Sequence, residues 1–216
     1  MTETTIDVRG SHTLTVPPER ATVHASVADD GPSPEPVLEA VSRAVAAVRA
    51  SVEPLLDRER GPVTALTVDQ VRTSRERPWN QQGERLPFVH RAEASLSVTF
   101  SAFDELTTWI DQSSAVPELR IGHIAWDLTP ARRANLEREA RGHALEDARI
   151  RAQDYADALG LGPVQVRRIA DPGVRPMFKA RAFAVAADEA AAPQLELAPE
   201  DLEITVEVEA TFTAGA

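Results

Sequence analysis

The five histidines are the first candidates for chemistry, because imidazole serves proteins both as a metal ligand and as an acid–base group. They are His12, His24, His90, His123 and His143. None belongs to a His-x-x-x-His or His-Glu-x-x-His pattern, which would place two ligands on one helix face. Three of them, His24, His90 and His123, fall on or beside predicted strands. The sequence leaves open whether they come together in the folded chain. We expect structural roles for all five, with no metal site and no cofactor.

Nucleophilic catalysis has no recognisable motif in this chain. There is no cysteine, which excludes thiolate nucleophiles, thiolate metal sites and disulfides. No Gly-x-Ser-x-Gly sequence is present to expose a serine at a sharp turn. The one close glycine pair, Gly160-Leu161-Gly162, ends a predicted helix, whereas a phosphate-binding loop normally precedes one.

Carboxylate pairs occur on a predicted long helix among arginines. Glu137 and Glu139 are two residues apart, and Glu146 and Asp147 are adjacent. Residues at these spacings point in different directions on a helix, so they make poor acid–base dyads. We expect an ion-paired surface there and a protein that is not an enzyme.

Trp79 is the candidate for a contact with another protein. It lies in the polar stretch 74–87 beside Arg75, Arg77 and Arg85. An aromatic side chain among arginines on a loop is typical of an interaction hot spot. The alternative, which the sequence leaves open, is that Trp79 folds back onto its own domain. Trp109 and Trp126 are expected in the core or at its edge.

Composition limits the class of partner. The chain has 216 residues, a formal net charge of −11 and an isoelectric point near 4.9, which argues against binding nucleic acid or anionic membranes. Residues 165–185 hold five bases and one acid, whereas residues 188–209 hold eight acids and no base. These stretches are able to pair within one chain or between two. No apolar run approaches 18 residues and no signal peptide is visible, so we expect no membrane insertion and a cytoplasmic location.

Alternation of apolar and polar residues predicts half-buried strands, which are typical of antiparallel or mixed sheets. It is clearest over 20–27, 91–100 and 203–212. Weaker strands are expected at about 4–9, 63–73, 118–127 and 164–170. The stretch 74–87 is expected to be a long hairpin excursion, and the stretch 171–199 is rich in proline and alanine and too long for a plain turn.

Helical spacing predicts three helices. The first runs from Ser33-Pro34 to about 56 with a kink near Pro54, the second covers 101–113, and the third runs from Pro130 to Leu159. The third helix carries residues at spacing four: Leu136, Ala140, Ala144, Ala148, Ala152 and Ala156. Spacing four overshoots a turn by about 40°, so this alanine line winds by about 200° and cannot all face one flat sheet. We expect it to be a packing surface, with Leu145, Tyr155 and Leu159 filling in where it drifts away.

The expected architecture is an α+β fold, in which an antiparallel or mixed sheet packs with one long and two shorter helices. The chain is expected to be a single domain, 1–216. Two β-α-β-β halves, 1–100 and 114–216 joined by the short helix, are an alternative within it.

Several segments resemble the SIMPL-domain family, a group of bacterial and animal proteins largely of uncharacterised function. They are Ile6-Asp7-Val8-Arg9-Gly10, Val16-Pro17-Pro18-Glu19-Arg20-Ala21, Ala156-Asp157-Ala158-Leu159-Gly160 and Ile204-Thr205-Val206-Glu207-Val208. Glu19 stands where Asp is common in the family. The resemblance implies an α+β domain that tends to oligomerise, with suggested roles in signalling or stress response. It supplies no established catalytic residues. Many bacterial members are exported, whereas this chain shows no export signal.

Together these observations favour a non-enzymatic, self-associating interaction module. We expect a homo-oligomer in which Trp79, Phe178 and Phe183 are contact residues. The alternative is a small-ligand-binding protein or an unrecognised enzyme with a pocket between helices and sheet. A deep pocket lined by His24, His90 or His123 with acids would favour that alternative.

Overall fold

A computed structural model describes residues 3–79, 85–113, 115–172 and 199–215 of the protein. Contacts divide the chain into two compact units. Residues 3–18, 128–172 and 200–215 form the first unit, and the second is built on residues 19–127. These boundaries are not those of the halves 1–100 and 114–216, because the first strand pairs with the last and the middle of the chain folds between them.

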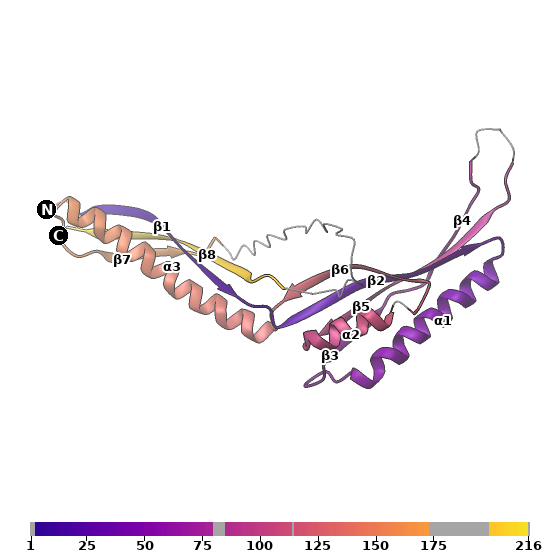
Figure 1. Cartoon of the computed structure of the whole chain (residues 1–216). Coiled ribbons are helices and arrows are strands. Elements are labelled where there is room, and N and C mark those ends of the chain that lie inside the picture. The colour runs from indigo at the N-terminus through magenta and orange to yellow at the C-terminus, as the bar shows by residue number, and fades with distance from the viewer. Residues whose placement is uncertain (1–2, 80–84, 114, 173–198, 216) are drawn as a thin grey trace, which may run out of the picture. The chain divides into compact units, whose positions relative to one another are not determined.

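The first unit is a three-stranded antiparallel sheet with one long helix (Figure 1). The strand order is β1 (Thr4–Val16), β8 (Leu202–Ala214), β7 (Gln165–Ala170). β1 and β8 stay in one register over their whole length, from Thr4 opposite Ala214 to Val16 opposite Leu202. The apolar residues of β8 are buried on the helix side, and its threonines and glutamates alternate with them.

Helix α3 (Pro130–Ala158) covers β1 and β8. Its start is capped by the Thr129 hydroxyl, which accepts a hydrogen bond from the Arg132 amide at 3.3 Å. Gly160, with φ of +67°, follows its end in the left-handed conformation that glycine favours. Twenty-nine helical residues span about 43 Å, which is also the length of a 13-residue strand. Helix and strand pair are therefore matched in length.

The whole alanine line of α3 is buried, from Leu136 to Ala156. The prediction of a packing surface is confirmed. Paired strands twist and coil, so the strand pair follows the winding line, which a flat sheet would not do. Leu145 packs against this core as expected, but Tyr155 and Leu159 are 60% and 66% exposed. Their predicted role as filling residues was wrong, because the line does not drift off the strands.

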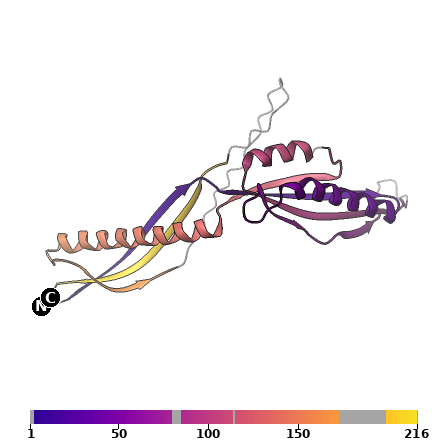
Figure 2. The same cartoon turned by 90° about the horizontal axis from the view of Figure 1, so that it is seen from below.

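The second unit is a five-stranded antiparallel sheet with both of its helices on one face (Figure 2). The strand order is β3 (Val63–Val68), β5 (Val89–Phe100), β2 (Arg20–Gly31), β6 (Leu119–Asp127). β4 (Arg72–Glu76) pairs with the first residues of β5, on the same edge of β5 as β3. The helices are α1 (Pro34–Val52) and α2 (Phe103–Ser113). A 3-10 turn over Glu53–Leu55 follows α1, as the proline at position 54 predicts.

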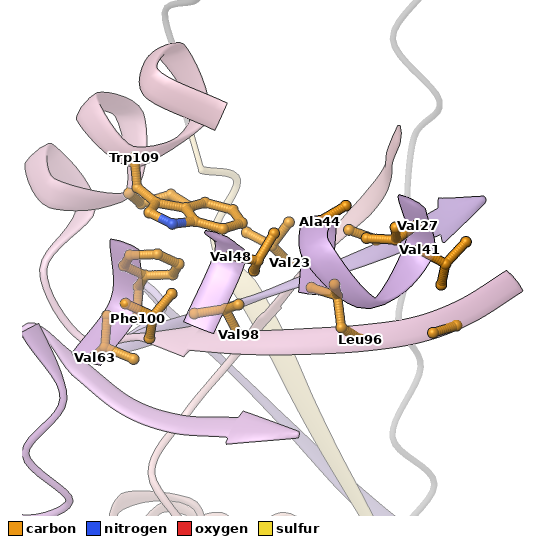
Figure 3. Close-up of a cluster of buried hydrophobic side chains, with 14 of the residues drawn as sticks. Val23, Val27, Val41, Ala44, Val48, Val63, Leu96, Val98, Phe100 and Trp109 are labelled. Atoms are coloured by element: carbon orange, nitrogen blue, oxygen red, sulfur yellow. The ribbon is translucent and has the colours of Figure 1, made fainter. Parts of the chain in front are cut away.

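The core of the second unit lies between these helices and the sheet (Figure 3). Val23 and Val27 of β2 and Val98 and Phe100 of β5 are fully buried there. Trp109 of α2 packs on Phe100 with ring centroids 5.5 Å apart. Its indole nitrogen donates to the Ser51 hydroxyl at 3.0 Å, so the buried polar group is satisfied.

The α+β class and all three helices are confirmed, and every predicted strand is present. The strand expected over 63–73 is in fact two strands, β3 and β4, which both pair with β5. Trp126 is partly buried at the core edge, as expected. Among the described residues, no helix combines the length and the apolar character needed to cross a bilayer.

Candidate functional site

The β4–β5 hairpin carries the most exposed aromatic side chain of the described residues. Trp79 is 82% exposed, so it does not fold back onto its own unit. Phe88, which directly precedes β5 on the other side of the hairpin, is 40% exposed. The guanidinium carbons of Arg75 and Arg77 lie 5.1 Å and 4.2 Å from the centre of the Phe88 ring. This is the distance range of cation–π contacts, which hold the arginines beside the aromatic group.

A shallow groove of about 420 Å³ adjoins this hairpin. One wall is the start of α1, with Val37 and Leu38, and the other is formed by β4 and β5, with Thr73 and Arg75. Leu38 is 43% exposed although it is apolar. The groove therefore offers an apolar strip that ends at arginine side chains.

The hairpin is locally basic in an acidic protein. Residues 72–93 hold five arginines and three glutamates, whereas the whole chain has a net charge of −11. Across the hairpin, Arg72 lies opposite Glu93 and Arg75 lies opposite His90. A surface of this kind suits a protein segment with apolar and acidic side chains. We call Trp79, Phe88, Arg75, Arg77 and the adjoining groove the hairpin surface.

The histidines form two ring contacts, one in each unit. His24 and His123 stack with centroids 4.4 Å apart on β2 and β6. His12 and His143 lie 4.5 Å apart on β1 and α3. His90 does not join His24 and His123 but lines the groove beside the hairpin. In the described ranges, no group of three or more His, Cys, Asp or Glu side chains could hold a metal ion.

The carboxylates of α3 form ion pairs, as the sequence predicted. Glu146 accepts from Arg149 at 2.6 Å and 2.8 Å, and this hydrogen bonding lowers the pKa of Glu146. Asp147 accepts from the Ser11 amide of β1 at 3.0 Å and pairs with Arg151 at 3.1 Å. These contacts occupy both carboxylates, and Asp147 joins the helix to the sheet.

The glutamates of the last strand, β8, form ion pairs with an arginine of the same sheet. Arg9 of β1 lies 2.8 Å from Glu209 and 3.7 Å from Glu207 of β8. Of the basic stretch 165–185, Arg167 pairs with Glu3 at 3.6 Å. Phe178 and Phe183, the other two expected contact residues, lie outside the described residues.

Sequence reasoning missed the groove. It left open whether His24, His90 and His123 converge, and the structure brings His24 and His123 together without His90. The groove depends on β4, which the sequence pattern did not separate from β3 in the single strand predicted over 63–73. The histidine pair depends on β2 lying beside β6, almost 100 residues later in the chain. An alternating pattern shows which residues share a face but not which strands are neighbours.

A protein-family model matches the chain. The family described as SIMPL, a protein of unknown function (DUF541), matches residues 6–212, nearly the whole chain. The chain therefore belongs to this family, and the resemblance inferred from its motifs is confirmed. No curated protein matches it.

Proposed function

We propose that this SIMPL-family chain is a non-enzymatic, self-associating interaction module that uses the hairpin surface as a contact. The observation that carries the proposal is the 82% exposure of Trp79 on a hairpin. A tryptophan side chain gains several kcal/mol when it is buried, so an assembly that covers it is favoured. The arginines beside Phe88 would then select an acidic surface of the second copy.

Strand edges support the same proposal. The five-stranded sheet ends in β3 and β4 on one side and in β6 on the other. All five side chains of β4 are exposed. An uncovered edge strand presents backbone donors and acceptors that a second chain can pair with. The hairpin surface therefore combines an aromatic anchor with an available strand edge.

A role in stress response or signalling and a cytoplasmic location are part of the proposal. The role rests on the family, and the location is the expectation drawn from the sequence. No catalytic constellation was found in the sequence, which is why the proposal is non-enzymatic. Phe178 and Phe183 stay in it as contact residues from the sequence alone.

A second candidate function is small-ligand binding in the groove beside the hairpin. The observation that favours it is the partly apolar lining at Val37 and Leu38 next to Arg75. The groove has a helix on one side and strands on the other, which supports this candidate. The openness of the groove to solvent favours a protein segment over a small molecule as its occupant.

Light scattering at tens of micromolar protein tests the proposal directly. We expect an oligomeric mass for the natural chain and a smaller mass for Trp79→Ser. Tyr155→Ser is the matched control, because Tyr155 is also an exposed aromatic residue but belongs to the other unit. A monomeric natural chain would exclude self-association, and a monomer that still binds small molecules in the groove would favour the second candidate.

A further inference from the structure

Two imidazole rings stack on the face of the five-stranded sheet that lies opposite its helices. His24 of β2 and His123 of β6 are direct partners across the two strands. Their ring centres are 4.4 Å apart and their planes differ by 15°. The helices α1 and α2 lie on the opposite face, with the apolar residues of β2 (Figure 2). The histidine pair is therefore accessible from solvent and is not part of the hydrophobic core.

A β-bulge fixes the position of this pair. The register shifts directly after His24, since His24 pairs with His123 whereas Ala25 pairs with Ile121. Gly122 is the extra residue, and a Cβ atom there would lie 3.1 Å from the His24 carbonyl oxygen. Bulges commonly re-aim side chains beside functional sites. Here the bulge sits next to both histidines and brings the two backbones close together.

The pair lines a shallow depression of about 460 Å³. Its other polar lining includes Ser26, Ser97, Asp69 and Arg120. The Asp69 carboxylate favours a cation in this depression, whereas the Arg120 guanidinium opposes it. The space admits an ion with water molecules that complete its coordination.

We propose that His24 and His123 form a two-imidazole chelate for a divalent late transition-metal ion, with copper(II) preferred. Imidazole nitrogens bind such ions at about 2.0–2.1 Å, so two nitrogens in neighbouring coordination positions lie about 2.9–3.4 Å apart. The ring centres are already 4.4 Å apart, but the ring planes are nearly parallel, so both imidazoles must turn about their Cβ–Cγ bonds before one nitrogen of each points at the same ion. The strands already hold the two ligands together, which reduces the entropy lost on binding.

The ligand number decides the strength and type of binding. No third histidine or carboxylate of the described residues is placed to complete a closed site. Water or hydroxyl groups therefore occupy the remaining positions, and the ion exchanges with solvent. Copper(II) is preferred because affinity for nitrogen ligands rises to copper and falls again at zinc.

Copper titration of the untagged full chain at pH 7.5 tests this site, followed by calorimetry and by electron paramagnetic resonance. We expect one copper per chain at this site, with nitrogen couplings from two imidazoles. Either His24→Gln or His123→Gln should weaken binding at least tenfold and remove one nitrogen.

Two control variants separate the pair from histidines in general. His90→Gln removes a histidine of the same unit that has no place in the pair, and copper binding at the site should be unchanged. His12→Gln disrupts the other ring contact, which is tilted by 34° and belongs to the first unit. If His24→Gln and His123→Gln, shown to be folded by circular dichroism, bind copper as the natural chain does, the proposal is overturned. Should His24→Gln fail to fold, the exposed His123 position decides alone.

Discussion

Gly10 lies in β1 where this strand passes close to the backbone of α3. A Cβ atom added at Gly10 would overlap the Ala144 carbonyl oxygen and would lie 2.6 Å from the Ala148 amide nitrogen. These are backbone atoms, which cannot rotate away as a side chain can. Gly10→Ala must therefore separate the strand from the helix, and we expect it to lower the free energy of unfolding by at least about 1–3 kcal/mol. Urea denaturation measures this change.

Gly142→Ala is the control for this substitution. Gly142 lies within α3, and nothing would stand within 4 Å of its added Cβ. Alanine should raise the free energy of unfolding there by about 0.5–1 kcal/mol, because glycine weakens a helix interior. Opposite signs at the two positions are the expected result. A Gly10→Ala variant as stable as the natural chain would contradict the close approach of β1 and α3.

Asp147 ties α3 to β1 in a way that depends on pH. The hydrogen bond from the Ser11 amide is the main cause of its lowered pKa, Arg151 and His12 act in the same direction, and partial burial opposes them. The pKa of Asp147 is thus lower in the folded chain than the ordinary value of about 3.9. Its contribution to stability is complete above that value and is lost as pH falls through the lowered folded pKa.

Asp147→Asn keeps an acceptor for Ser11 but removes the charge. We expect the variant to be less stable than the natural chain at pH 7 and the difference to shrink below about pH 4. Denaturation curves from pH 7 to pH 2.5 measure it. Asp154→Asn, an exposed carboxylate on the same helix, is the matched control. A difference that stays constant over this range would show that the charge of Asp147 contributes nothing.

The positions and contacts of some individual residues could be predicted from the sequence, and those of others could not. The buried alanines followed from helical spacing, because spacing reports which residues share a face. The role of Gly10 did not, because it depends on a helix more than 130 residues away in the chain. Asp147 was expected to pair with arginines, whereas its principal partner is a backbone amide of β1.

Helix α3 depends as an element on small side chains. Ala148 lies in the middle of its alanine line and is completely buried against the strands. Ala148→Leu should overpack this contact and reduce the free energy of unfolding by about 1–3 kcal/mol. For a chain of this size, that lowers the melting temperature by several degrees. Ala134→Leu is the control, since Ala134 is exposed on the same helix. An unchanged melting temperature for Ala148→Leu would show that this face of α3 is not packed.

Element positions were largely predictable, whereas their pairing was not. Alternation located β2, β5 and β8 because each has one apolar face, and capping residues located the ends of α3. The pairing of β1 with β8 joins residues about 200 apart, which no local pattern contains. The exposure of Tyr155 shows the same limit, because it depends on how the paired strands coil beneath the helix.

The whole molecule carries a net charge of −11, so two copies repel each other at long range. In the proposed assembly, contact between copies must therefore come from local apolar surface such as Trp79, and charge would select the orientation. A surface ion pair contributes less than about 1 kcal/mol, which is too little to hold an assembly together. Salt distinguishes these contributions, because it screens charges but does not weaken apolar contacts.

We therefore expect the oligomeric mass to be unchanged or larger in 1 M sodium chloride, where the screening length is about 3 Å. Sedimentation velocity at low and high salt measures this mass. Exchange of Phe178 and Phe183 for serine should reduce the mass at both salt concentrations, because it removes apolar side chains and leaves the net charge unchanged. Tyr155→Ser provides the matched loss of an exposed aromatic group elsewhere. An assembly that dissociates in high salt would show that ion pairs hold it, and the apolar contact proposed for the hairpin surface would then be wrong.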